Sequence, residues 1–384
     1  MSEALDRLAD ACGIEPGYYD VAGRHFATSE DTKRPLLQAM GLDASSEGAC
    51  RDSLDRFTRR GEVGLGPVLV TRDADRIAAR TGVPDGTYDW RLSHPTGERR
   101  EGRATVHDGW LDLAFEALPH GRASLEFDAN GGIRTEIVMA PPRCARPEDL
   151  GIDRGFGITG QVYSLRDGRE VPTGDYTSLA DLCRRAGRAG ADLVGINPVH
   201  APFPAAHDRP SPYSPSNRAF LDWRLVDPAN APGIEPEDIA DAPSGPELIE
   251  WPAAIGWRMD ALSKAHRRFV ANAGHPLRDS FVSFRAAGDG ALQDQCLFDA
   301  LSTRFGGLPW WDWPEEYRSA RSGAVERFSE EAAHEISFFA YLQWVADRQL
   351  AQAHEAGRHA GMRLGLYRDL AVGADPAGAA SWAT

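Results

Sequence analysis

The chain has 384 residues, of which 42% are hydrophobic and 26% are charged, and its formal net charge is −15. This composition is ordinary for a soluble globular protein of two or three domains. The acidic balance argues against a nucleic-acid surface or an anionic membrane as a partner. The five cysteines are scattered and form no CxxC pair, which disfavours a disulfide framework or a zinc site and fits a reduced cytoplasm. No signal-peptide core and no membrane-spanning stretch of ~18 apolar residues is present, so we expect a cytoplasmic protein.

Residues 1–62 predict a small helical segment without chemistry. Apolar residues at helical spacing favour a first helix over residues 3–14. A second helix is expected from the cap at Ser29 to the stop at Gly41, and a third over residues 47–60.

Residues 63–143 change to short runs in which apolar and polar residues alternate, as in 88–92 and 123–127. Gly131-Gly132 marks a hairpin. Several short strands at this spacing predict a small antiparallel β-sandwich. Such a domain could bind carbohydrate or pack beside an enzyme; the lack of clustered exposed aromatic residues favours packing.

A stiff proline-rich linker over residues 141–147 predicts a domain boundary. After it, residues 157–165 predict a buried strand, 175–188 an amphipathic helix and 191–198 a second strand. Strand, helix and strand within about 40 residues form a βαβ unit, which implies a parallel sheet.

A long irregular insertion, about 199–280, follows the second strand. Insertions at the C-terminal ends of parallel strands commonly carry function. We expect helices over 258–272, 290–305 and 329–359, and a further buried strand over 362–367.

Three features in this half could carry chemistry. His200 lies just past a strand end and could donate a hydrogen bond, although a lone histidine at a strand end is more often structural. Two prolines hold Tyr213 stiffly in the run Ser211–Pro215, which suits a sugar face but equally a simple turn. Asp369 emerges from a predicted buried strand, where a carboxylate is costly unless Arg368 or a polyol satisfies it.

The cluster Trp310–Glu315 could stack on sugar rings or fix a loop into the core. Motifs for nucleotide, metallopeptidase and α/β-hydrolase chemistry are missing.

Five motifs in one order resemble the 4-α-glucanotransferases called amylomaltases or disproportionating enzymes, glycoside hydrolase family 77, in their bacterial long form. They are Gln161–Arg166, Ala191–Ala201, Ser211–Arg218 (the SPYS-x-S-x-R pattern), Phe338–Trp344 and the strand that ends in Asp369. The resemblance covers essentially the whole chain.

The resemblance implies an α/β fold in which residues 150–384 form the first half of a (β/α)8 TIM barrel. It implies transfer of α-1,4-glucan segments between maltooligosaccharides by a retaining mechanism, with no metal and no organic cofactor. Tyr213 resembles the tyrosine near the −1 subsite, and Asp369 an aspartate that helps to hold the substrate. Ser211 and His200 are expected as further substrate contacts.

In the family, the nucleophile, the acid/base glutamate and a third aspartate lie downstream of the position of Asp369. A complete barrel needs ~250 residues, so we expect this chain to be a C-terminally truncated N-terminal part that is inactive alone. A catalytically dead protein that binds glucan or a partner is the alternative. A hydrolase of the wider α-amylase group fits less well, because the Asn-His that usually ends that group's first region does not follow Asp369.

Overall fold

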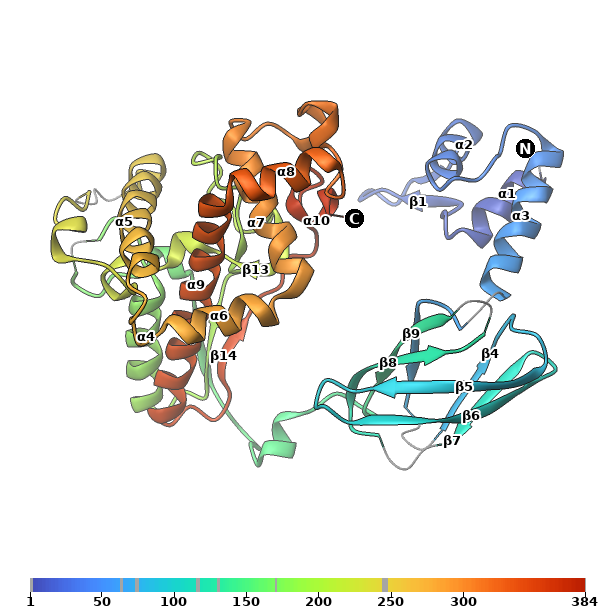
Figure 1. The fold of residues 1–384 in the computed structure, drawn as a ribbon, viewed down its shortest axis with the longest axis horizontal. Helices are drawn as coiled ribbons and strands as arrows, with labels where there is room; N and C mark the ends of the chain where they lie inside the picture. Colours follow the sequence, from blue (N-terminus) through green and yellow to red (C-terminus); the bar gives the residue numbers. More distant parts are fainter. Residues whose placement is uncertain are drawn as a thin grey trace. The chain divides into compact units, whose positions relative to one another are not determined.

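The computed structural model of the chain is shown in Figure 1. It describes residues 3–62, 65–72, 76–114, 118–129, 132–169, 171–243 and 248–383. The chain divides into two compact units, residues 1–145 and 146–384. In the ranges described, no helix is both long and apolar enough to cross a membrane.

The first unit begins with the three predicted helices, which bury a small apolar cluster that includes Leu5, Leu8 and Leu37. These helices are α1 (Glu3–Ala11), α2 (Glu30–Ala39) and α3 (Glu47–Glu62). A hairpin between α1 and α2 was not predicted; its strands are β1 (Gly17–Tyr19) and β2 (His25–Ala27). Each strand has only three residues, which is too short for a clear alternating pattern.

The rest of the first unit is one seven-stranded sheet, a nearly closed barrel-like sheet (Figure 1). Its strands are β3 (Val68–Thr71), β4 (Arg76–Arg80), β5 (Gly86–Ser93), β6 (Arg99–His107), β7 (Trp110–Ala114), β8 (Gly121–Phe127) and β9 (Ile133–Met139), in the order β3-β9-β8-β5-β6-β7-β4. The predicted sandwich of two antiparallel sheets is therefore wrong in detail. All described pairs are antiparallel except β3 with β9, which is parallel. The alternation of apolar and polar residues shows that one face of each strand is buried. It does not show whether that face packs inside one curved sheet or against a second sheet. Of the predicted hairpin glycines, Gly131 lies outside the described residues and Gly132 has φ +93°.

The second unit contains the predicted parallel sheet. Its strands are β10 (Gly157–Gly160), β11 (Leu193–Ile196) and β14 (Gly365–Arg368), in the order β10-β11-β14. Helices α4 (Tyr176–Arg188) and α9 (Ala333–His359) lie against each other and connect to these strands. Both predicted steps, strand–helix–strand and helix–strand, are confirmed.

The burial of β10 and of the end of β14 was predicted wrongly, whereas β11 is buried. β10 ends at Gly160, and the next turn begins where the side-chain oxygen of Asn197 accepts a hydrogen bond from Val162 N at 2.8 Å. Ile158 is 39% exposed and Tyr367 on β14 is 67% exposed. An apolar run shows that a strand can be buried on both faces, whereas the packing of neighbouring elements decides whether it is.

The insertion between β11 and β14 is mostly helical. It contains the short strands β12 (His200–Ala201) and β13 (Asn217–Leu221), helices α5 (Trp251–Ala271), α6 (Arg278–Ala287), α7 (Asp289–Arg304) and α8 (Gly323–Glu331), and the short helix α10 (Ala379–Trp382) follows β14. Helix α5 starts at Trp251 rather than at 258, and α6 was not predicted. The long helix predicted over 329–359 is divided at Ala332 into α8 and α9.

The tryptophan cluster fixes a loop into the core. Trp313 is 1% exposed, and its ring packs at 5.5 Å from Phe298 and 6.0 Å from Trp382, centroid to centroid. Trp310 donates from Nε1 to Pro376 O at 3.0 Å. The core interpretation of this cluster is therefore confirmed for Trp313, whereas Trp311 remains 42% exposed.

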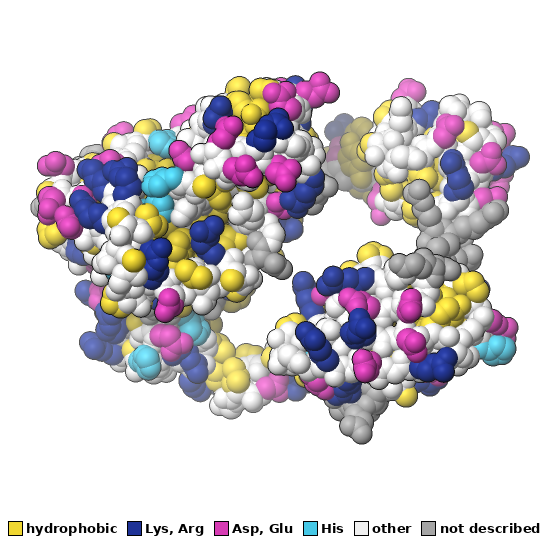
Figure 2. All heavy atoms as spheres, in the orientation of Figure 1, with side chains coloured by type: hydrophobic (Ala, Val, Ile, Leu, Met, Phe, Trp, Pro, Cys, Tyr) yellow, Lys and Arg dark blue, Asp and Glu magenta, His cyan; other side chains and the backbone are white. Residues whose placement is uncertain are grey.

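A buried ion network fixes the start of α4. Arg169 makes ion pairs with Asp167 at 2.7 Å, Asp175 at 2.7 Å and Asp227 at 2.9 Å. Asp175 is also the N-cap of α4, because its carboxylate accepts from Ser178 N at 2.8 Å. On the face shown in Figure 2, positive and negative side chains are interspersed, and no single-sign patch dominates either unit.

Candidate functional site

The C-terminal ends of β10, β11 and β14 meet at one edge of the parallel sheet, as the register requires. Just past this edge, Asn197 is 8% exposed and uses both ends of its amide. Its oxygen accepts from Val162 N, and its nitrogen donates to Pro198 O at 2.8 Å. The backbone N–H of Asp369 donates to Ile196 O at 3.1 Å. The loops that follow the three strands are thereby fixed to one another.

His200 lies half-buried on β12, beside the loop that follows Asp369. Its Nε2 accepts a hydrogen bond from Ala371 N at 3.2 Å. Burial lowers the pKa of His200 below its usual value, and a hydrogen bond with the backbone of Arg218 partly opposes this. The imidazole is therefore neutral near pH 7 and holds the loop after β14, while its contact with a substrate stays a prediction.

The second half of the Ser211–Arg218 motif anchors the segment after β14. Ser216 is fully buried, and its Oγ accepts from Ala379 N at 2.9 Å. Arg218 donates from Nη1 to Val372 O at 2.7 Å and to Ala371 O at 3.2 Å. The motif Ser211–Arg218 therefore contacts the segment that directly follows another motif, the strand that ends in Asp369.

The first half of the same motif is exposed to solvent. Tyr213 is 59% exposed. Ser211 and its neighbours line a hollow of about 390 Å³, and Tyr163 and Trp251 form part of its wall. The rings of Tyr163 and Trp251 meet edge to face at 5.5 Å between centroids. Tyr213 lies in the loop that lines the hollow, although its own side chain is not part of the lining.

Sequence reasoning missed Tyr163 and Trp251 as parts of this wall. Tyr163 belongs to the motif Gln161–Arg166, so that motif was a usable signal for it. Trp251 stands at the start of α5, outside every motif, and only the folded chain brings it to the hollow.

Asp369 is exposed to solvent. The expectation that its carboxylate leaves water at the end of a buried strand is therefore wrong. Among the described residues its carboxylate has no side-chain partner, whereas the nearby Asp375 is paired with Arg209 at 2.6 Å. The Asp369 carboxylate is therefore available to accept hydrogen bonds from a polyhydroxylated ligand.

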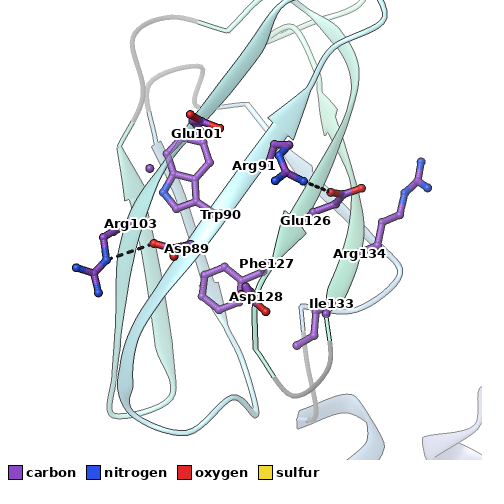
Figure 3. A pocket seen from close by; sticks show the side chains of 12 residues that line it. Asp89, Trp90, Arg91, Glu101, Arg103, Glu126, Phe127, Asp128, Ile133 and Arg134 are labelled. Carbon is purple, nitrogen blue, oxygen red and sulfur yellow. Dashed lines mark hydrogen bonds and ion pairs between the residues drawn. The ribbon is translucent and has the colours of Figure 1, made fainter.

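A larger hollow, about 780 Å³, lies on the sheet of the first unit (Figure 3). Across neighbouring strands its charges alternate in register, from Arg134 through Glu126 and Arg91 to Glu101. Arg91 pairs with Glu126 at 3.0 Å. Arg103 pairs with Asp89 at 3.3 Å, and Arg134 donates to Ser124 at 2.9 Å. Because most of these charged groups already have partners on neighbouring strands, we interpret this surface as cross-strand pairing rather than a ligand site.

Metal-ligand side chains are grouped at one place among the described residues, at Asp85, His107 and Asp108. All three are exposed, and such acidic groups are common without a metal. This group does not change the expectation of a metal-free site.

Comparisons with known proteins agree with this arrangement. The family model of 4-alpha-glucanotransferase matches residues 160–384, more than half of the chain. A 4-alpha-glucanotransferase of Mycobacterium tuberculosis is 30% identical over 418 residues, which cover 100% of this chain and 57% of that protein. The corresponding protein of Haemophilus influenzae is 25% identical and is covered over 56% of its length.

Solved structures show the same fold. The crystal structure of amylomaltase from Corynebacterium glutamicum matches 99% of this chain and 56% of its own with a TM-score of 0.73 and 23% identity. The chain spans little more than half the length of these relatives. On the match of the family model and of the ordered motifs, the chain belongs to the 4-alpha-glucanotransferase family.

Proposed function

We propose that this chain forms part of a 4-alpha-glucanotransferase that transfers α-1,4-glucan segments between maltooligosaccharides. The observation that carries the proposal is the contact between the Ser211–Arg218 motif and the loop that directly follows Asp369. Arg218 of the Ser211–Arg218 motif binds the loop that follows Asp369, and His200 binds the same loop. Together they build one open, polar edge at the C-terminal ends of parallel strands, where barrel enzymes place their sites.

The second unit supplies the first strands of a (β/α)8 barrel in this proposal. The parallel order β10-β11-β14, with α4 and α9 packed together, supports it. The exposure of Tyr367 on the last of these strands also supports it, because a barrel strand is covered once its neighbours are present.

We assign four substrate contacts. The ring of Tyr213 and the hydroxyl of Ser211 would meet the apolar and polar parts of a glucose unit, since sugar sites combine aromatic faces with a few placed polar groups. The carboxylate of Asp369 would accept from sugar hydroxyls. His200, neutral at pH 7, would contact substrate from the same edge or fix the loop that does.

The chemistry of a retaining glycosidase needs two carboxyl groups about 5–5.5 Å apart. Near this edge, Asp375 is engaged by Arg209, which leaves Asp369 as the exposed carboxylate that we assign to the site. We therefore propose that the nucleophile and the acid/base come from sequence beyond these 384 residues. The chain by itself would bind maltooligosaccharides and would not turn them over.

The test is maltotriose disproportionation by the 384-residue chain and by a longer version of the protein, with products followed by chromatography. The proposal expects glucose and longer maltooligosaccharides from the longer version only. Turnover by the 384-residue chain would show that carboxylates within it do the chemistry. No turnover by either version, with binding intact, would support a protein that only binds glucan.

Binding of maltoheptaose to the 384-residue chain tests the assigned contacts. Tyr213→Ala is expected to weaken affinity about tenfold, the loss of a stacking or hydrogen-bonding contact of roughly 1.4 kcal/mol. Tyr19→Ala is the matched control, because Tyr19 is also highly exposed, at 72%, and lies in the other unit. Equal effects of the two substitutions would contradict the assignment.

A further inference from the structure

Helix α9 holds the strand beside the site through one side chain. Gln343, from the motif Phe338–Trp344, is 3% exposed. Its Oε1 accepts from Leu221 N at 2.8 Å, and its Nε2 donates to Leu221 O at 2.8 Å. One amide therefore satisfies both backbone groups of one residue, as a neighbouring strand would do.

We call this pair of hydrogen bonds from one side-chain amide to one backbone residue a clip. Leu221 connects the Gln343 clip to the site. It is the last residue of β13 and stands opposite His200 in the antiparallel pair β12–β13. The same strand carries Arg218, which donates to the loop after Asp369. The outer edge of β13 is thus fixed by Gln343 and its inner edge by the strand that carries His200.

The same helix contains a second clip of the same chemistry. Gln349 is 5% exposed, accepts from Asp227 N at 2.8 Å and donates to Asp227 O at 2.9 Å. Asp227 belongs to the ion network around Arg169. Because the second clip fixes a structural network rather than β13, the chain supplies its own control.

We propose that Gln343 is a positioning residue of the glucan site: it fixes β13 and, through β13, the orientation of His200 and of the loop that carries Asp369. This inference rests on the proposed function. It explains why a buried glutamine stands within an otherwise apolar and aromatic helical motif.

Gln343→Glu tests the proposal because it keeps the shape and replaces the donating amide nitrogen by a carboxyl oxygen. An ionised carboxylate only accepts hydrogen bonds, so it would accept from Leu221 N and oppose Leu221 O. A protonated carboxyl donates to that carbonyl and restores the clip. Burial raises the pKa of the new carboxyl above the usual ~4.3.

Two carboxylates and one guanidinium lie near the clip. Asp347 lines the same hollow of about 250 Å³ as Gln343 and Leu221. Asp222, next in the chain to Leu221, is paired with Arg224 at 2.8 Å. Arg224 offsets the charge of Asp222, whereas Asp347 and burial disfavour a further negative charge, so the variant recovers at mildly acidic pH.

The experiment measures maltoheptaose affinity of the wild type, Gln343→Glu and Gln349→Glu in the 384-residue chain at about pH 8 and about pH 5. We expect Gln343→Glu to lose at least about tenfold in affinity at the higher pH, and to return to within about threefold of the wild type at the lower pH. Gln349→Glu is expected to match the wild type in affinity at both values, although its stability shows the same pH dependence.

Hydrogen exchange supplies a readout that does not need a ligand. In Gln343→Glu at the higher pH, peptides covering residues 196–201 and 368–373 are expected to exchange faster than in the wild type. These peptides contain His200 and Ala371, whose backbone N–H donates a hydrogen bond to His200.

Two results would overturn the positioning role. One is wild-type affinity and exchange in folded Gln343→Glu at the higher pH. The other is an equal loss of affinity in both variants, which would indicate a general effect on stability. A wild type that binds no maltoheptaose would refute the proposed function instead, and the exchange data would still decide the role of Gln343.

Discussion

Replacing Arg169 by methionine removes the cation that pairs with three aspartates of a buried network and keeps most of the side-chain volume. Two of its three partners are almost fully buried: the side chains of Asp175 and Asp227 are 0% and 2% exposed. Breaking a buried pair by removing one partner costs about 3–5 kcal/mol. Because the side chain of Arg169 is 33% exposed, we expect the lower end, about 3 kcal/mol. That is a large share of a typical unfolding free energy of about 5–15 kcal/mol.

The loss of unfolding free energy in Arg169→Met should depend on pH in a defined direction. Burial and the neighbouring Asp227 already raise the pKa of Asp175 in the folded chain, in spite of Arg169. Without Arg169 this folded-state pKa rises further above its unfolded value near 3.9. A carboxyl of raised pKa destabilises the fold when ionised, so Arg169→Met should regain stability as the pH falls from about 7 toward 5.

Urea unfolding followed by tryptophan fluorescence measures this effect. Of the ten tryptophans, Trp90 and Trp110 lie in the first unit, which leaves eight in the second unit to report on the network. Arg185→Met on α4 is the matched control: Arg185 pairs with Asp181 at 2.6 Å but is 71% exposed. Such a surface pair contributes about 0–1 kcal/mol. A loss below about 1 kcal/mol in Arg169→Met, or one that grows at acid pH, would refute the reasoning.

Three further outcomes are expected. Asp192→Asn should destabilise the fold at neutral pH and match the wild type in strong acid. The hydrogen bond with Arg363 lowers the pKa of Asp192, so the stability that the Asp192 carboxylate contributes is lost as the pH falls through that value. A difference between the urea midpoints of variant and wild type that stays constant across a pH series would contradict this. In native protein a thiol reagent should label the exposed Cys144 quickly and Cys183, whose pKa burial raises to about 12, only after unfolding; fast native labelling of Cys183 would contradict its burial. Trp313→Ala should cost about 3–5 kcal/mol in the same urea assay, and a change below 1 kcal/mol would place Trp313 outside the core.

Much of the second unit was readable from local pattern. The spacing of apolar residues in 175–188 predicted α4, and the strand–helix–strand order predicted the parallel sheet that the registers confirm. The motif Ser211–Arg218 was also recognised, but only the structure separates its open half from the half in which Ser216 and Arg218 bind backbone far along the chain.

The misses share one physical cause. The alternation of apolar and polar residues in the first unit indicated which side of each strand is buried. It did not indicate how distant strands pair, and their pairing gives one barrel-like sheet instead of the expected sandwich. The apolar run at 362–367 predicted a buried strand, yet Tyr367 is exposed because burial depends on neighbours that local sequence does not encode.

The sequence by itself determined the family, most of the helices and strands and the loop that carries Tyr213, since motifs and periodicities are properties of consecutive residues. Only the tertiary structure decided which residues meet. It brought Trp251 to the hollow beside Ser211, and it placed the amide of Gln343 on both backbone groups of Leu221. Contacts across more than a hundred residues depend on the closure of long loops, and their geometry emerges only when the whole chain packs.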